Sequence, residues 1–328
     1  MLNYDLLIKN GRVVDGTGNP WFLADLGIKK GKIVKIGKIA EKTSALTIDA
    51  TGLIVAPGFI DIHTHDDIAL FLDTLNKQKL QQGITTVVTG NCGISFAPVN
   101  RKYLSLLEGY TATLVGKSDI IKWNSFAEFL NKLDQSEPGM NVTSLVGHGT
   151  LRIAVMGVEN KEPTVEELEK MKKLLAQSME GGAIGMSTGL IYPPGVYSKT
   201  KELVELCKVV AEYSGIYVSH IRGEGDTVLQ AIEEALEIGR EANVPVGISH
   251  HKVSGKSNWG SSVKTLARIK KARADGIDVT ADAYPYTAGS TMLTALFPPW
   301  VYAGCEEKFI ERVKDQKARV AIKRDIEE

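Results

Sequence analysis

Two histidines at the end of a short apolar segment place the strongest constraint on what this chain can fold into. Residues 58–62 are apolar apart from one aspartate and lead directly into His63-Thr64-His65, which predicts a short strand near 59–65. Side chains alternate between the two faces of a strand, so His63 and His65 are expected to point the same way. Imidazole is the commonest metal ligand, and two on one face can close on one ion. Two solvated strand-end histidines are the alternative interpretation.

Further metal-binding side chains stand at matching places along the chain. Cys92 follows the β-branched run 85–89, His220 closes the run 216–219, and His250 closes the run 244–249. The carboxyl ends of parallel strands converge on one rim of a β/α barrel, where such folds build their active sites. Thiolate and imidazole are natural zinc ligands. The pattern therefore predicts a metal site at this rim, with separate structural roles for the same residues as the alternative.

Short apolar strands alternate with helical stretches from residue 58 onward, which is typical of a parallel sheet. The predicted fold class is α/β, with a TIM-like (β/α) barrel and an insertion at about 95–140 that carries a helix around 126–133. Seven strands are predicted, one short of a closed barrel, so either the eighth is missing or residues 290–297 form it. The strands lie near 59–65, 85–91, 141–148, 183–188, 216–222, 244–251 and 278–284, and further helices are expected after Thr164, over 226–238 and over 308–328.

A small β module precedes the barrel. Residues 4–55 contain short strands punctuated by glycine, with turns indicated at Asn10-Gly11, Asp15-Gly16 and Lys30-Gly31. Pro57-Gly58 marks the change to the alternating pattern. We therefore predict two domains, with residues 1–56 as the N-terminal part of a small β-sandwich and residues 57–328 as barrel strands one to seven.

Composition narrows the class of partner. Lys+Arg and Asp+Glu both number 39, so the formal net charge is zero and no basic field favours nucleic acid. The amino terminus lacks the order of a signal peptide, and no apolar run approaches membrane-spanning length. Three widely spaced cysteines offer no disulfide framework. These features predict a cytoplasmic protein that acts on a small molecule, without nucleic-acid or membrane partners.

At this point the residues resemble a known family. Pro57-Gly58-Phe59-Ile60-Asp61-Ile62-His63-Thr64-His65 is similar to the first-strand signature of the amidohydrolase superfamily, which are metal-dependent hydrolases on a distorted barrel. Within it, the chain most resembles the N-acyl-D-amino-acid deacylases, or D-aminoacylases. The resemblance runs in order through the chain and includes Gly90-Asn91-Cys92-Gly93, Val146-Gly147-His148-Gly149, Gly185-Met186-Ser187-Thr188-Gly189-Leu190, Ser219-His220-Ile221-Arg222, Ser249-His250-His251-Lys252 and Asp282-Ala283-Tyr284-Pro285-Tyr286-Thr287-Ala288-Gly289-Ser290.

The resemblance implies a ligand set. Cys92, His220 and His250 would hold a tightly bound zinc ion, and His63 and His65 would form a second, looser position shared with Cys92. The hydantoinase-like branch uses a carboxylated lysine as its bridge, and no suitable lysine stands at the fourth strand end. Family members also continue past this length, with an eighth-strand aspartate as the catalytic acid/base and strands that complete the β domain. On this resemblance the chain stops before both, so no catalytic residue is assigned within it.

Candidate substrate-binding side chains lie on the loops of the same rim. Arg222 is placed to grip a substrate carboxylate, with a salt bridge to Glu224 or Asp226 as the competing use. His148 ends the third strand and reaches either the mouth of the site or a hydrogen-bond partner. The remaining candidates are Tyr192, Tyr284, Tyr286 and Ser290. For each of them, core packing is the alternative.

The segment Gly185-Met186-Ser187-Thr188-Gly189 is a literal Gly-x-Ser-x-Gly motif. In serine hydrolases that motif forms a sharp elbow between a strand and a helix. Here Pro193-Pro194 follows closely and opposes an immediate helix. The context therefore disfavours Ser187 as a nucleophile.

Three functions remain open on the sequence. The leading hypothesis is a zinc-dependent hydrolase that cleaves the amide bond of N-acyl-D-amino acids, with hydrophobic side chains preferred. A metal-dependent cyclic amidohydrolase, similar to hydantoinase or dihydroorotase, is the second. An inactive, truncated metal-binding remnant is the third. A barrel without its eighth strand leaves two strand edges unpaired, so self-association through these edges is also expected.

Overall fold

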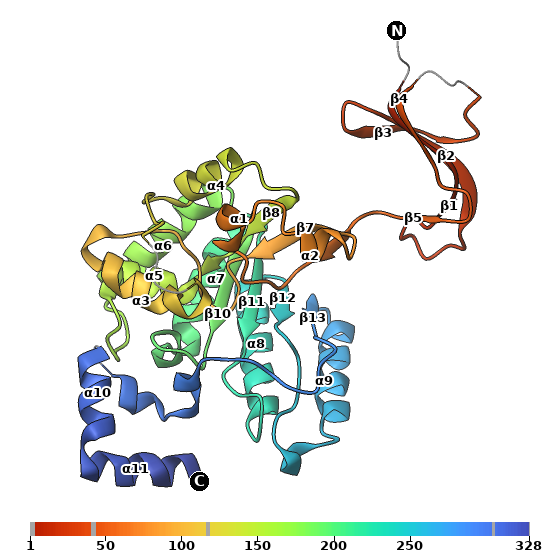
Figure 1. Ribbon diagram of the computed structural model, residues 1–328. Helices are drawn as coiled ribbons and strands as arrows, with labels where there is room; N and C mark the ends of the chain where they lie inside the picture. Colours follow the sequence, from red (N-terminus) through yellow and green to blue (C-terminus); the bar gives the residue numbers. More distant parts are fainter. Residues whose placement is uncertain (1–3, 41–43, 116–118, 304–305, 328) are drawn as a thin grey trace. The chain divides into compact units, whose positions relative to one another are not determined.

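The computed structural model describes residues 4–40, 44–115, 119–303 and 306–327. The chain divides into two compact units, Met1–Phe59 and Ile60–Glu328 (Figure 1). The division falls close to the predicted boundary between residues 56 and 57. Each unit has its own sheet structure and is described by itself.

The first unit is a five-stranded sheet in the order β3-β2-β1-β4, with β5 also paired to β1. The β1–β2 and β2–β3 pairs are antiparallel, whereas β4 and β5 run parallel to β1. The described residues of this unit therefore form one sheet, and its membership of a small β-sandwich stays a prediction. The strands are β1 (Tyr4–Val13), β2 (Phe22–Lys29), β3 (Lys32–Gly37), β4 (Ser44–Asp49) and β5 (Ile54–Val55).

The predicted turn at Asn10-Gly11 is wrong, because both residues lie inside the continuous strand β1. The register against β2 shifts between Ile8 and Gly11, and Asn10 has a φ of 61°. An extra residue with positive φ is the signature of a β-bulge, which favours the same residue types as a tight turn. Lys30-Gly31 does form a two-residue hairpin loop, with φ values of 51° and 71°.

The second unit carries its strands in two sheets. One has the order β6-β7-β8 and the other β13-β12-β11-β10-β9. The pairs from β9 to β13 and the β7–β8 pair are all parallel, as the alternating pattern predicted. The strands are β6 (Phe59–Asp61), β7 (Ile84–Thr89), β8 (Asn141–Ser144), β9 (Val146–Gly147), β10 (Gly185–Gly189), β11 (Ile216–His220), β12 (Val246–Ile248) and β13 (Val279–Ala281).

Residues 290–297 do not supply an eighth strand. A 3₁₀ helix, Leu293–Leu296, occupies half of this segment, and no residue of it lies in a strand. Within the part of the chain that the structure describes, β6 and β13 are therefore the end strands of their sheets. Self-association through these edges stays a prediction.

Helices connect the successive parallel strands and pack on them (Figure 1). Thr164 caps α6 through a reciprocal pair of hydrogen bonds with Glu167, as its position before the apolar spacing predicted. No helix among the described residues is long and apolar enough to cross a membrane. The α-helices are α1 (Ala69–Leu72), α2 (Lys77–Leu80), α3 (Leu104–Val115), α4 (Phe126–Gln135), α5 (His148–Met156), α6 (Val165–Glu180), α7 (Thr200–Glu212), α8 (Val228–Ala242), α9 (Ser262–Ala274), α10 (Glu306–Lys314) and α11 (Gln316–Glu327).

The core of the second unit lies between these helices and the parallel strands. In α8, the buried residues include Ile232 and Leu236, one turn apart on the same face. Complete burial of such a side chain contributes about 1.5–3 kcal/mol. Cys207 of α7 is also completely buried in this core, as a small apolar side chain would be. Cys92 and Cys207 are free thiols, whereas Cys305 lies outside the described residues.

Candidate metal centre

His63 and His65 lie in the loop that follows β6 and not within the strand, since β6 ends at Asp61. Strand alternation therefore does not explain why their rings face one region. The loop is instead held by Lys79 of α2, whose Nζ lies 2.7 Å from Asp61 Oδ2 and 2.6 Å from Asp66 Oδ2. The two imidazole centroids are 5.7 Å apart at an interplanar angle of 77°.

Cys92 lies in a turn that follows β7. Its φ is 53°, a left-handed backbone conformation that few side chains other than asparagine and aspartate adopt. This turn directs Sγ at two imidazoles: it lies 3.3 Å from His63 Nε2 and 3.6 Å from His250 Nε2. The side chain is buried, as a metal-binding or core thiol would be.

His220 and His250 complete the cluster from the far strands. His220 is the last residue of β11, and His250 follows the end of β12. His250 Nε2 lies 2.8 Å from His220 Nδ1. Two groups of three residues each have potential ligand atoms that all lie within 4.8 Å of one another. The first group is His63, Cys92 and His250, and the second is His220, Glu224 and His250. His250 belongs to both groups.

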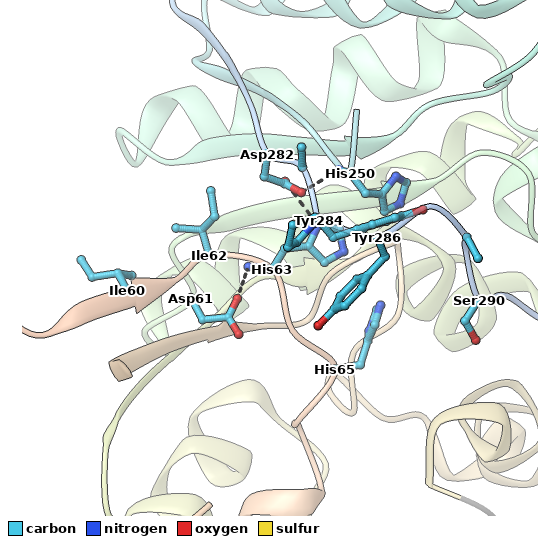
Figure 2. Close-up of a pocket in the computed structure, with 13 residues that line it drawn as sticks. Ile60, Asp61, Ile62, His63, His65, His250, Asp282, Tyr284, Tyr286 and Ser290 are labelled. Carbon is cyan, nitrogen blue, oxygen red and sulfur yellow. Dashed lines mark hydrogen bonds and ion pairs between the residues drawn. The ribbon is translucent and has the colours of Figure 1, made fainter. Parts of the chain in front are cut away.

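Two carboxylates that the sequence interpretation did not assign to the site lie beside the Nδ1 atoms of His63 and His250. Asp282 Oδ2 lies 3.3 Å from His63 Nδ1, and its Oδ1 accepts a 2.6 Å hydrogen bond from the His250 backbone N–H (Figure 2). Glu224 Oε1 lies 3.0 Å from His250 Nδ1 and 2.5 Å from Lys252 Nζ. A carboxylate on one ring nitrogen leaves the other free as a ligand and fixes the ring. Asp282 directly follows β13, so the rule that selected the other strand-end residues also applied to it.

Burial sets the protonation states of this cluster. It lowers the pKa of His65 to about 4 and that of His220 to about 3, so both rings are neutral at pH 7. Burial also raises the pKa of the Cys92 thiol, and the charges of Asp282 and Glu224 raise it further. Burial opposes ionisation of Glu224, but its bond with His250 and its contact with Lys252 outweigh that effect and lower its pKa to about 2.

A pocket of about 590 Å³ opens beside His63, His65 and His250 (Figure 2). Three of the predicted rim residues line it, Tyr284, Tyr286 and Ser290, together with the apolar side chains of Ile60 and Ile62. Tyr192 contacts the cluster from another side, with its ring centroid 4.9 Å from that of His220. Its hydroxyl lies 2.7 Å from Thr291 Oγ1.

His148 and Arg222 have partners away from this pocket. His148 is completely buried, and its Nε2 lies 2.7 Å from Glu202 Oε1, which corresponds to the hydrogen-bonded interpretation. Arg222 pairs with Glu234 through Nε and Nη2, at 2.9 Å each, and not with Glu224 or Asp226. Its Nη1 and Nη2 also donate to the carbonyls of Val196 and Ser198. The guanidinium therefore holds the loop that carries Tyr192.

Comparisons with known proteins place the chain in a family. A D-aminoacylase from Alcaligenes xylosoxydans xylosoxydans is 43% identical over 290 residues, which is 88% of this chain and 59% of that protein. A crystal structure of N-acyl-D-glutamate deacylase from Bordetella bronchiseptica, in complex with zinc and a phosphonate that mimics the tetrahedral intermediate, aligns with a TM-score of 0.81 and 41% identity over 86% of this chain and 59% of that one. The chain thus spans about three-fifths of the length of these relatives.

An L-hydantoinase from Arthrobacter aurescens aligns with a TM-score of 0.55 at 19% identity, over 94% of this chain and 65% of that one, and shares the fold alone. The profile described as "Amidohydrolase family" matches residues 46–323, which is most of the chain. This chain belongs to the amidohydrolase family.

Proposed function

We propose that this chain is a zinc-dependent hydrolase that cleaves the amide bond of N-acyl-D-amino acids to a carboxylate and a D-amino acid. The observation that carries the proposal is the convergence of Cys92 Sγ with the Nε2 atoms of His63 and His250. We further propose that the strands from β6 to β13 form seven strands of a (β/α) barrel, with the consecutive β8 and β9 counted as one. The segments at their C-terminal ends supply the residues of this cluster.

The residues fit a zinc ion. His65 Nδ1 and His220 Nε2 are buried and have no hydrogen-bond partner among the described residues, so each ring retains an unused nitrogen. We propose that Cys92, His220 and His250 hold the tight position, and that His63 and His65 form a weaker one that shares Cys92. A zinc ion held by these residues would lower the pKa of a bound water and polarise an amide carbonyl. Cys92 would bind such an ion as the thiolate, the form that burial alone disfavours.

The chain's own side chains position this centre and shape the pocket. Glu224 and Asp282 orient the rings of His250 and His63 so that each Nε2 faces Cys92. Both oxygens of Asp282 are occupied, one by the His250 N–H and one by His63 Nδ1. We therefore assign Asp282 to positioning and not to proton transfer. Tyr284 and Tyr286 line the pocket beside this centre.

The apolar lining of the pocket supports N-acyl-D-amino acids with hydrophobic side chains as substrates. The alternative, a cyclic amidohydrolase, has only a shared fold in its favour. Counted from β6 with β8 and β9 as one strand, β10 is the fourth strand of the proposed barrel. It carries no lysine that could serve as the carboxylated bridge of the hydantoinase-like branch.

Zinc content and chiral assays test the proposal together. The purified chain should contain zinc near one equivalent, and Cys92→Ala should lose the tightly bound ion, whereas Cys207→Ala removes the other buried thiol as a matched control and should keep it. Hydrolysis of N-acetyl-D-leucine should exceed that of N-acetyl-L-leucine, N-acetyl-D-glutamate and hydantoin. Full zinc retention in Cys92→Ala, or faster turnover of hydantoin, would contradict the proposal.

A further inference from the structure

The Gly-x-Ser-x-Gly motif of β10 has a role other than the one that its sequence suggests. Ser187 lies in the middle of the strand and is completely buried. Its hydroxyl donates to the carbonyl of Gly90 at 2.5 Å and accepts from the N–H of Gly93 at 3.0 Å. Both partners are backbone groups of the turn that contains Cys92. One side chain therefore joins the two ends of a turn more than 90 positions away in the sequence.

That turn needs external support. Gly90, Cys92 and Gly93 all have positive φ values, of 74°, 53° and 74°. A non-glycine residue in this region costs roughly 1–2 kcal/mol and persists only where its surroundings impose it. In an unsupported loop, the backbone at Cys92 would relax and carry Sγ away from the imidazoles.

The last glycine of the motif, Gly189, allows the turn to pack closely against β10. A Cβ on Gly189 would lie 2.1 Å from the carbonyl oxygen of Cys92, so any larger residue would displace the cysteine backbone. Strand β10 itself is fixed between β9 and β11 by parallel pairing. The motif therefore forms a rigid template for the turn: the Ser187 hydroxyl binds the turn's backbone, and the missing side chain of Gly189 leaves space for the Cys92 carbonyl.

We propose that Ser187 and Gly189 are positioning residues that hold Cys92 Sγ between His63 and His250. This inference rests on the proposed function for the identity of the metal, but the template itself is a property of the metal-free chain. It replaces the nucleophile interpretation on geometry, because the hydroxyl of Ser187 is buried and bonded to backbone atoms instead of to a histidine.

Ser187→Ala tests the proposal, with Ser178→Ala as the matched control. Ser178 is another buried serine, whose hydroxyl donates to the Leu174 carbonyl at 2.7 Å within α6, away from the cluster. Zinc affinity is measured by chelator competition. Ser187→Ala should lose about 10–100-fold, the range typical of residues that orient metal ligands, while Ser178→Ala should stay within about twofold. Equal zinc affinity in Ser187→Ala and the wild type would overturn the proposal.

A double-mutant cycle separates positioning from a general loss of stability. In a Cys92→Ala background, Ser187→Ala should change the residual zinc affinity by less than about twofold, because the atom that it positions is gone. An undiminished effect in that background would show that Ser187 acts by another route. Labelling of Ser187 by a fluorophosphonate would restore it as a nucleophile and would also overturn the proposal.

A metal-free readout distinguishes failure of this inference from failure of the proposed function. With Cys207 and Cys305 replaced by alanine, Cys92 is the only thiol in the chain. Its reaction with a disulfide reagent should accelerate about three- to tenfold in Ser187→Ala, because the turn opens more readily without its hydrogen bonds. Faster labelling in a chain that binds no zinc would refute only the metal assignment. Unchanged labelling would refute the template.

Discussion

Substitution of Glu202 by leucine should destabilise the second unit severely. Glu202 of α7 is buried and accepts from Arg152 Nη1 with both oxygens, at 2.8 and 2.6 Å. It also bonds His148 Nε2 at 2.7 Å. Arg152 is completely buried and is among the largest side chains in the core without solvent contact. Glu202→Leu would leave that guanidinium charge in the interior without a counter-ion.

The expected loss is about 3–5 kcal/mol, the usual cost of removing one partner from a buried ion pair. A surface pair provides the control. Glu166 pairs with Lys170 one turn along α6, with side chains 80% and 59% exposed, and Glu166→Ala should cost no more than about 0.5 kcal/mol. The free energy of unfolding is obtained from urea titrations followed by intrinsic fluorescence, to which the buried Trp123 contributes.

The double variant Arg152→Met/Glu202→Leu sharpens the test. Because apolar replacement of a whole buried pair is often near neutral, the double variant should be more stable than Glu202→Leu alone. The remaining cost is the unpaired His148 donor, about 1–3 kcal/mol. A loss below about 1 kcal/mol in Glu202→Leu, or additive losses in the double variant, would refute the reasoning.

Three further predictions concern the site and its supports. Lys79→Met removes the ammonium that holds the loop of the first two histidines, and should lower zinc affinity at the weaker position about tenfold or more in titrations of metal-loaded protein. Burial lowers the pKa values of His65, His148 and His220, so below about pH 6.5 the unfolded chain binds protons that the folded chain does not. The free energy of unfolding of metal-free protein should therefore fall on acidification, by up to about 1.4 kcal/mol per pH unit for each ring. A flat profile from pH 7 to 5 would contradict this. In Arg222→Lys, the lysine cannot bind Glu234 and the two carbonyls together, so limited proteolysis should cut the 190–198 loop sooner than in the wild type. An unchanged digestion pattern would show that Arg222 does not hold this loop.

Local sequence patterns determined the elements of this protein. The apolar spacing of α8 and the Thr164 cap of α6 depend on residues three or four positions apart, which lie on the same face of a helix wherever it packs. The strand ends that carry His220 and His250 followed from short apolar runs and from the rule that parallel strands meet at one rim. For the same reason, the approach of His63 and His250 to Cys92 was predictable.

The partners of the individual side chains were decided only by the tertiary structure. Asn10-Gly11 favours positive φ in a turn or a bulge alike, and the pairing of β1 with β2 selected the bulge. Arg222 had acidic neighbours in sequence, yet its guanidinium pairs with Glu234, which α8 presents to it. Strand-end position likewise did not distinguish the proposed ligands from Asp282, whose carboxylate lies 3.3 Å from His63 Nδ1.

Ser187 illustrates the physical reason most clearly. Its motif is the same string of residues that forms a nucleophile elbow elsewhere, and a string specifies only which atoms a segment can offer. Whether a buried hydroxyl meets a histidine or a backbone turn depends on which distant segment the packing brings within about 3 Å, the range of a hydrogen bond. Here, packing of the turn after β7 against β10 placed Gly90 and Gly93 on that hydroxyl, and separation along the chain carried no information about that distance.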